Sequence, residues 1–228
     1  MTAKAPDRVS PPFAAVLFDM DGLLFDSERL ALTVIERITR EAGTPIPREV
    51  ILRTVGCNTQ LSKEIYLEYE PRMEYDRLRA VFAAEMRRMG SLGQIPLKEG
   101  ALPLLRLLKR RGIPRAVASS SPRSTVEACL RGAGIDALMD HLVCGDEITR
   151  SKPDPEAFLL AARALNVPPA RCLVLEDSLN GIKAGRAAGC TVCMIPDLFP
   201  WQEELAAFAD LHYSSLAGVL PLFEAAAR

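Results

Sequence analysis

Residues 14–27 read AAVLFDMDGLLFDS, and this stretch decides how the rest of the sequence is interpreted. Five apolar residues, from Ala14 to Phe18, run without alternation and stop abruptly at Asp19. A short continuous apolar run is typical of a strand that is covered on both faces, as in a parallel sheet. Asp19 and Asp21 therefore come directly after the end of a predicted buried strand.

The same pattern, an apolar run followed by polar residues, recurs along the chain. Stretches with helical periodicity lie between these runs, and several of them are bounded by Gly or Pro. Alternation of strand, polar loop and helix predicts an α/β fold, here a Rossmann-like three-layer core with a parallel sheet. The further predicted strands are 116–118, 141–144, 172–175 and 189–195, and the predicted helices are 101–111, 125–131, 155–166 and 181–188.

Residues 29–97 interrupt this alternation. Their apolar positions recur with the helical period of about 3.6 residues, and no strand pattern is found among them. The clearest example is the set Leu30, Val34 and Ile38. We therefore expect an inserted all-helical cap over residues 29–97, and a Rossmann-like core formed by residues 1–28 and 98–228.

The composition excludes several classes of function. The chain has 228 residues, with 28 basic and 29 acidic side chains and only two histidines. This balance gives no basic excess for nucleic acid or an anionic membrane surface. No apolar run reaches the roughly 18 residues that span a bilayer, and the first residues lack the apolar stretch of a secretory signal. We expect a cytoplasmic monomer that binds neither nucleic acid nor membrane.

Polar residues follow several of the predicted strands and should meet at one edge of the sheet. In an open parallel sheet, ligands bind beyond the carboxyl ends of the strands. Taken singly, each polar group also has a structural interpretation, namely a turn, a helix N-terminus, a solvated lysine or a helix cap. Their occurrence together favours one shared site. The candidates are Asp19, Asp21, Ser119, Ser120, Lys152, Glu176 and Asp177.

The chemistry of this set points to phosphoryl transfer. Converging carboxylates repel one another unless a cation lies between them, and oxygen ligands without nearby histidine select Mg²⁺. The Ser119 hydroxyl, backbone N–H groups at the following helix and the Lys152 ammonium supply donors for an anion. One carboxylate could then attack a phosphorus atom in line and form an aspartyl-phosphate.

Four motifs in this sequence resemble those of the haloacid dehalogenase superfamily. The insertion after the first motif resembles the helical cap of the branch that holds β-phosphoglucomutase and the phosphatases of small phosphorylated metabolites. The resemblance covers nearly the whole chain, from Phe13 to about Ser215. The motifs are FDMDGLLFDS at 18–27, Ser119-Ser120, KPDP at 152–155 and EDSLNG at 176–181.

This resemblance implies a role for each acidic residue by its position. Asp19 would be the nucleophile and a ligand of the metal. Asp21 would be the general acid and base, and its backbone carbonyl would also bind the metal. Asp177, with Glu176 directly or through water, would complete the metal site.

The resemblance also implies which groups bind the substrate. Ser119, with the backbone near Ser120, would hold the transferring phosphoryl group, and Lys152 would neutralise its charge and help orient Asp19. The cap would choose the substrate through a loop between two of its helices. The residues expected in that loop are Gly56, Cys57 and Asn58.

The second acid of the first motif separates reactions within the superfamily. An alkoxide leaving group needs a proton and a halide does not, so Asp21 favours phosphate esters over carbon–halogen bonds. The resembled mutases carry a His and an Arg where this sequence has Ala31 and Thr59. We expect a Mg²⁺-dependent phosphatase that acts on a sugar phosphate or nucleoside-type monophosphate. A β-phosphoglucomutase-like mutase is the alternative.

A receiver-type signalling module is an alternative from another class. It also combines acidic residues after its first strand with a phosphorylated Asp, Mg²⁺ and a Lys. Receivers are much shorter than this chain and have no helical cap, and their acceptor Asp follows a later strand. The length of the chain and its insertion therefore favour the enzyme.

Overall fold

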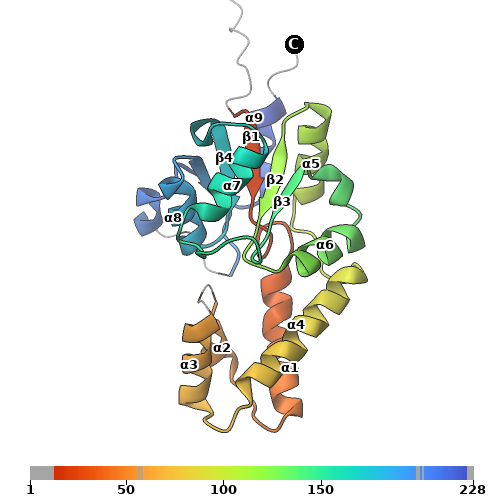
Figure 1. Cartoon of the computed structure of the whole chain (residues 1–228), viewed down its shortest axis with the longest axis vertical. Coiled ribbons are helices and arrows are strands. Elements are labelled where there is room, and N and C mark those ends of the chain that lie inside the picture. Colours follow the sequence, from red (N-terminus) through yellow and green to blue (C-terminus); the bar gives the residue numbers. More distant parts are fainter. Residues whose placement is uncertain (1–12, 56, 58, 199–200, 202, 225–228) are drawn as a thin grey trace, which may run out of the picture.

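The α/β prediction is confirmed by the computed structural model, which describes residues 13–55, 57, 59–198, 201 and 203–224 (Figure 1). Its core is a six-stranded sheet in the order β3-β2-β1-β4-β5-β6, and all neighbouring strands are parallel. The strands are β1 Ala15–Phe18, β2 Arg115–Ala118, β3 His141–Val143, β4 Cys172–Glu176, β5 Thr191–Met194 and β6 Leu211–His212. The sequence did not predict β6, because two residues form no recognisable apolar run.

The position of β1 between β2 and β4 brings the predicted site residues to one edge. Phe18, the last residue of β1, pairs with Val117 of β2 and with Leu175 of β4. The three strands therefore end at the same level. Asp19, Ser119 and Glu176, which lie at these ends, meet there although they are far apart in the sequence.

Helices cover both faces of the sheet, which explains the unbroken apolar run of β1. Val16 and Phe18 pack in a cluster with α5 and α6, whereas Ala15 and Leu17 pack in a second cluster with α7 and α8. The helices are α5 Ala101–Arg110, α6 Arg123–Gly132, α7 Glu156–Ala164, α8 Leu179–Ala187 and α9 Pro221–Glu224. Short 3-10 helices cover Asp136–Leu138, Pro169–Arg171, Glu203–Ala207 and Leu216–Val219.

Four helices follow β1 and form the lower part of the molecule in Figure 1. They have an apolar cluster of their own, which includes Leu32, Ile51 and Tyr66. The helices are α1 Ser27–Glu41, α2 Arg48–Leu52, α3 Thr59–Tyr69 and α4 Tyr75–Ser91. Helix α2 was not predicted, since five residues are too few to show a period. None of the helices in the described ranges has both the length and the apolar character needed to cross a membrane.

The chain enters and leaves these four helices through two crossings that lie side by side. The Asp26 N–H donates to the Pro96 carbonyl at 2.9 Å, and the Lys98 N–H donates to the Leu24 carbonyl at 2.9 Å. Phe25 and Leu97 form an antiparallel bridge between them. The two crossings therefore form one short connection between α1–α4 and the sheet, close to the end of β1.

A second contact between the two parts of the chain is made by glycines of α4 and α6. A Cβ atom added to Gly132 would lie 1.9 Å from the Gly90 carbonyl oxygen and 2.8 Å from the Gly93 nitrogen. A Cβ atom added to Gly90 would lie 2.6 Å from the Cys129 Sγ. At Gly132 the two backbones therefore approach so closely that no side chain fits, and the Cys129 side chain fills the space beside Gly90.

We predict that Gly132→Ala destabilises the protein. The added methyl group meets backbone atoms, which no change of rotamer can move, and such overpacking costs about 1–3 kcal/mol. This cost should exceed what alanine gains over glycine in helix propensity. Urea unfolding gives the free energy, with the exposed Ser91→Ala on α4 as control, expected to change it by less than about 0.5 kcal/mol. Equal stability of both variants would contradict the close contact.

Candidate active site

Lys152, from the loop between β3 and α7, lies at the centre of the predicted site. Its ammonium donates to Asp19 Oδ1 at 2.5 Å, to Glu176 Oε1 at 2.6 Å and to the Ala118 carbonyl at 3.0 Å. These three acceptors lie at the ends of β1, β4 and β2. The Lys152 side chain is only 7% exposed, and its ammonium lies 4.7 Å from the centre of the Phe158 ring. One buried cation therefore joins the ends of three neighbouring strands.

The carboxylates around this cation crowd one another. Burial raises the pKa of Asp19 to about 8; Lys152 opposes that rise, while Glu176 adds to it. Burial also raises the pKa of Asp177 well above its ordinary value, and Glu176 and Asp19 add to the effect. The two neighbouring carboxylates outweigh burial at Lys152 and raise its pKa, so the ammonium stays charged. The site therefore holds more negative charge than one lysine compensates.

Glu176 is held on both of its oxygens. Oε1 accepts from Lys152, and Oε2 accepts from the backbone N–H of Asp177 at 2.9 Å and of Ser178 at 3.0 Å. Ser178 in turn caps α8, because its Oγ accepts from the Gly181 N–H at 3.0 Å. The structural interpretation of this motif as a helix cap is therefore correct, and it coexists with the site. Both Glu176 oxygens therefore have partners within the protein.

The Asp21 carboxylate is held by two serines from different parts of the chain. Oδ1 accepts from the Ser27 hydroxyl at 2.8 Å, and Oδ2 accepts from the Ser121 hydroxyl at 2.9 Å. Ser27 is the first residue of α1, and its Oγ also accepts from the Gly22 N–H at 3.2 Å. The orientation of Asp21 therefore depends both on the loop after β2 and on the start of the inserted helices.

The three serines after β2 differ in their surroundings. Ser119 is 1% exposed, and its Oγ accepts from the Ser121 N–H at 3.0 Å. Ser120 is exposed, and its hydroxyl makes no hydrogen bond to another residue that the structure describes. Ser121 contacts Asp21 but was not among the predicted site residues. The run of three serines in the sequence indicated that a serine of this loop belongs to the site. Which of the three contacts Asp21 depends on the conformation of the loop.

Glycine brings Asp177 against the loop of the first motif. Gly22 has a φ of +78°, and a Cβ atom added to it would lie 2.3 Å from Asp177 Oδ2. The loop can approach this carboxylate only because no side chain stands at this position. Asp177 therefore lies next to the segment that carries Asp19 and Asp21, as a shared metal site requires.

Two acidic residues near this site were not predicted. The pKa of Glu28 is raised to about 7, mainly by burial and in addition by the nearby charges of Asp21 and Asp197. Asp197 follows β5, and its side chain is 1% exposed. Glu28 directly follows the first motif, which could have drawn attention to it. Asp197 follows an apolar run, as the other site residues do, but no motif marked it.

Of the three predicted cap contacts, Gly56 and Asn58 lie outside the described residues. Cys57 is half-buried, and its thiol donates to the Arg53 carbonyl at 3.3 Å. Cys57 also lines a cavity of about 200 Å³ among α1, α3 and α4. Apolar side chains, including Ile38 and Phe82, form much of its wall. Thr54 and Tyr66, whose hydroxyl oxygens lie 3.0 Å apart, also line it.

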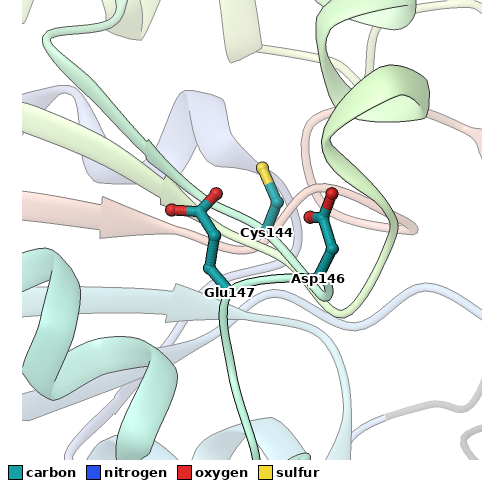
Figure 2. A group of neighbouring side chains, drawn as sticks. All are labelled: Cys144, Asp146 and Glu147. Atoms are coloured by element: carbon teal, nitrogen blue, oxygen red, sulfur yellow. The ribbon is translucent and has the colours of Figure 1, made fainter.

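A separate group, Cys144, Asp146 and Glu147, lies in the loop after β3 (Figure 2), and its possible ligand atoms are all within 4.8 Å of one another. Arg123 contacts both carboxylates of this group. Its backbone N–H donates to Asp146 Oδ1 at 3.0 Å, and its guanidinium pairs with Glu147. We therefore assign this group a structural role, which is to tie the start of α6 to the loop after β3.

The fold is a Rossmann-like core with helices inserted after its first strand, and the site lies at the carboxyl ends of β1, β2 and β4. The family model for haloacid dehalogenase-like hydrolases matches residues 13–189, and the chain belongs to this family. The predicted family is therefore confirmed.

Named relatives narrow the class of reaction. The chain is 36% identical over 210 residues to a probable pseudouridine-5′-phosphatase from Drosophila melanogaster, covering 85% of this chain and 89% of that protein. It is 32% identical over 178 residues to a phosphorylated carbohydrates phosphatase from Thermotoga maritima, and the match covers 77% of this chain and 81% of that protein. The chain is a phosphoric monoester hydrolase, and small phosphorylated molecules are the substrates of its class.

Two further matches give the extent of the similarity. The crystal structure of CbbY from Rhodobacter sphaeroides in complex with phosphate superposes with a TM-score of 0.79 at 28% identity, covering 93% of this chain and 99% of that one. The bifunctional riboflavin kinase/FMN phosphatase from Arabidopsis thaliana is 32% identical over 212 residues, which are 90% of this chain and 54% of that protein. The chain thus spans about half the length of that relative.

We predict that Lys152→Met destabilises the protein, and more so at high pH. Removing the cation leaves Asp19 and Glu176 buried without their partner, which costs about 3–5 kcal/mol. A carboxyl group whose pKa is higher in the folded than in the unfolded state binds a proton on folding. Its contribution to stability is therefore lost as pH rises from about 4 to its folded pKa, which is about 8 for Asp19 in the wild type. Without Lys152 the folded pKa rises further, so the variant goes on losing stability above pH 8, where the wild type no longer does.

Urea unfolding at pH 7 and pH 9 measures this effect. The deficit relative to the wild type should be larger at pH 9, above the folded pKa of Asp19 in the wild type. Lys109→Met is the control, since Lys109 is exposed and donates to a backbone carbonyl at 2.8 Å. A deficit that does not depend on pH would show that the lysine does not compensate these carboxylates.

Proposed function

We propose that this chain is a Mg²⁺-dependent phosphatase that hydrolyses a sugar phosphate or a nucleoside-type monophosphate through an aspartyl-phosphate on Asp19. The observation that carries the proposal is the placement of Lys152 against Asp19 and Glu176 at the strand ends. The printed names of the Drosophila melanogaster and Thermotoga maritima relatives, a pseudouridine-5′-phosphatase and a phosphatase of phosphorylated carbohydrates, support this substrate class.

The donor set fits Mg²⁺. Asp19 is buried and Asp177 is half-buried, and the pKa values of both carboxylates are raised, so a hard cation between them would relieve the repulsion. Asp19, Asp177 and the backbone carbonyl of Asp21 would hold the ion, with Glu176 acting directly or through water. The bound ion would draw charge from the phosphoryl oxygens.

The residues of the chain then divide the reaction between them. A carboxylate oxygen of Asp19 attacks the phosphorus, and the bond from phosphorus to the leaving oxygen breaks. Lys152 neutralises charge on the phosphoryl group and orients Asp19, and Ser119 with the backbone near Ser120 holds the group in line. Asp21 gives a proton to the leaving oxygen. It then takes a proton from the water that attacks the same phosphorus and frees Asp19.

The inserted helices would bind the rest of the substrate. We propose that residues 29–97 form a cap and that residues 1–28 and 98–228 form the catalytic core, with the paired crossings as the hinge. The cavity beside Cys57 has apolar walls and hydroxyl groups, which suit a sugar or a base. A cap closed over the core would exclude water while the ester bond breaks.

The mutase alternative is not proposed. The positions where the resembled mutases carry His and Arg hold Ala31 and Thr59, and neither side chain can act as a base or bind a second phosphate as an arginine does. The phosphatase names of the relatives agree with this choice.

We predict that the protein releases inorganic phosphate from members of a panel of sugar phosphates and nucleoside monophosphates, and that it needs Mg²⁺. Excess EDTA should abolish release, and added Mg²⁺ should restore it. Asp19→Asn should lower kcat by on the order of 10³-fold or more, because the nucleophile is lost. The exposed Asp136→Asn is the matched control. Full activity in EDTA, or isomerisation of β-glucose 1-phosphate without release of phosphate, would refute the proposal.

We predict that Asp21→Asn affects substrates according to their leaving groups. Release of an alcohol from an alkyl phosphate in the first turnover should slow by about 10²–10⁴-fold, since an alkoxide must be protonated. Release of a nitrophenol from an aryl phosphate should slow far less, because a nitrophenolate leaves without a proton. Equal losses for the two substrates in rapid-quench measurements would exclude the role of general acid.

A further inference from the structure

Asp197, which follows β5, connects to both crossings through one of its oxygens. Oδ1 accepts from the Lys98 ammonium at 2.5 Å and from the Arg29 guanidinium. Arg29 lies in the first turn of α1, and Lys98 lies where the chain returns to the sheet. Because the Asp197 side chain is 1% exposed, these ion pairs are largely shielded from water on the carboxylate side.

The other oxygen of Asp197 has no such partner. Oδ2 is buried and makes no hydrogen bond to any residue that the structure describes. It lies beside the first motif, since a Cβ atom added to Gly22 would be 3.3 Å from it and 2.3 Å from Asp177 Oδ2. The free oxygen of Asp197 and an oxygen of Asp177 thus approach the same point.

A buried carboxylate oxygen without a donor is costly, and a second carboxylate nearby adds repulsion. Lys98 and Arg29 both donate to Oδ1 of Asp197, so neither of them satisfies Oδ2. A hydrogen-bond donor or a positive charge between Asp197 Oδ2 and Asp177 would satisfy this oxygen and reduce the repulsion between the two carboxylates.

We propose that Asp197 is a positioning residue of the metal site: its Oδ2 accepts a hydrogen bond from a water molecule on the ion that Asp177 binds. This inference rests on the proposed Mg²⁺ site. Mg²⁺ keeps several of its waters when few carboxylates bind it, and partners outside the first coordination sphere orient those waters. Asp197 would thus have two roles. Its Oδ1 pairs with Lys98 and Arg29 at the crossings, and its Oδ2 would orient a water molecule on the metal ion.

Titration calorimetry of the full-length protein with Mg²⁺ tests this inference without using activity. Asp197→Asn keeps the size of the side chain but removes its charge. It should weaken Mg²⁺ binding by about 10-fold or more, as is usual when such a partner is lost. Lys98→Met is the matched control, because it breaks a contact to Oδ1 and leaves Oδ2 in place. It should bind Mg²⁺ at least as tightly as the wild type.

Each outcome has a separate meaning. Unchanged Mg²⁺ affinity in Asp197→Asn, with a wild type that binds the ion, would overturn the inference. Equal weakening in Lys98→Met would also overturn it, since the geometry of the crossings would then explain the loss. A wild type that binds no Mg²⁺ would instead refute the proposed function. If Asp197→Asn does not fold by circular dichroism, the double variant K98M/D197N, compared with Lys98→Met, makes the same measurement.

Discussion

The contact of the Lys152 ammonium with three strand ends is the interaction on which the site depends. A charge this deeply buried is stable only when its partners are equally well placed. Asp19, Glu176 and the Ala118 carbonyl meet this condition because β1 lies between β2 and β4 and all three strands end together. The order of the strands therefore determines whether the site can form.

The same constraint extends to the helices that begin at the site. One oxygen of Glu176 accepts from Lys152, and the other accepts from the backbone N–H groups of Asp177 and Ser178, which directly precede α8. A Cβ atom added to Gly181 would lie 1.8 Å from this carboxylate, so the helix must carry glycine where it passes. Asp21 is linked to α1 through Ser27 in a similar way. A shift of α8 would therefore displace the Glu176 carboxylate, and a shift of α1 would displace the Asp21 carboxylate.

The sequence was sufficient to predict what depends on local pattern. Continuous apolar runs predicted the five longer strands, and the change to a helical period after β1 predicted the insertion. Because site residues in a parallel sheet follow directly on the strands, the positions of Asp19 and Asp177 could be predicted before their contacts were known. These predictions needed no knowledge of how distant segments pack.

What the sequence did not reveal depends on loop conformation or on contacts between distant segments. Ser121 rather than Ser120 contacts Asp21, because the loop turns the middle serine outward. Asp197 becomes part of the site only when the loop after β5 packs against Gly22. Elements as short as α2 and β6 have too few residues to show a period, and their neighbours in space determine them.

A crystal structure with Mg²⁺ and beryllium fluoride, a mimic of a phosphoryl group on a carboxylate, would test the central claim most directly. The account predicts beryllium bonded to an oxygen of Asp19, with Lys152 and Ser119 on its fluorides and Mg²⁺ on Asp177 and the Asp21 carbonyl. Beryllium fluoride bound elsewhere, or a site in which Asp19 and Asp177 share no metal ion, would contradict it.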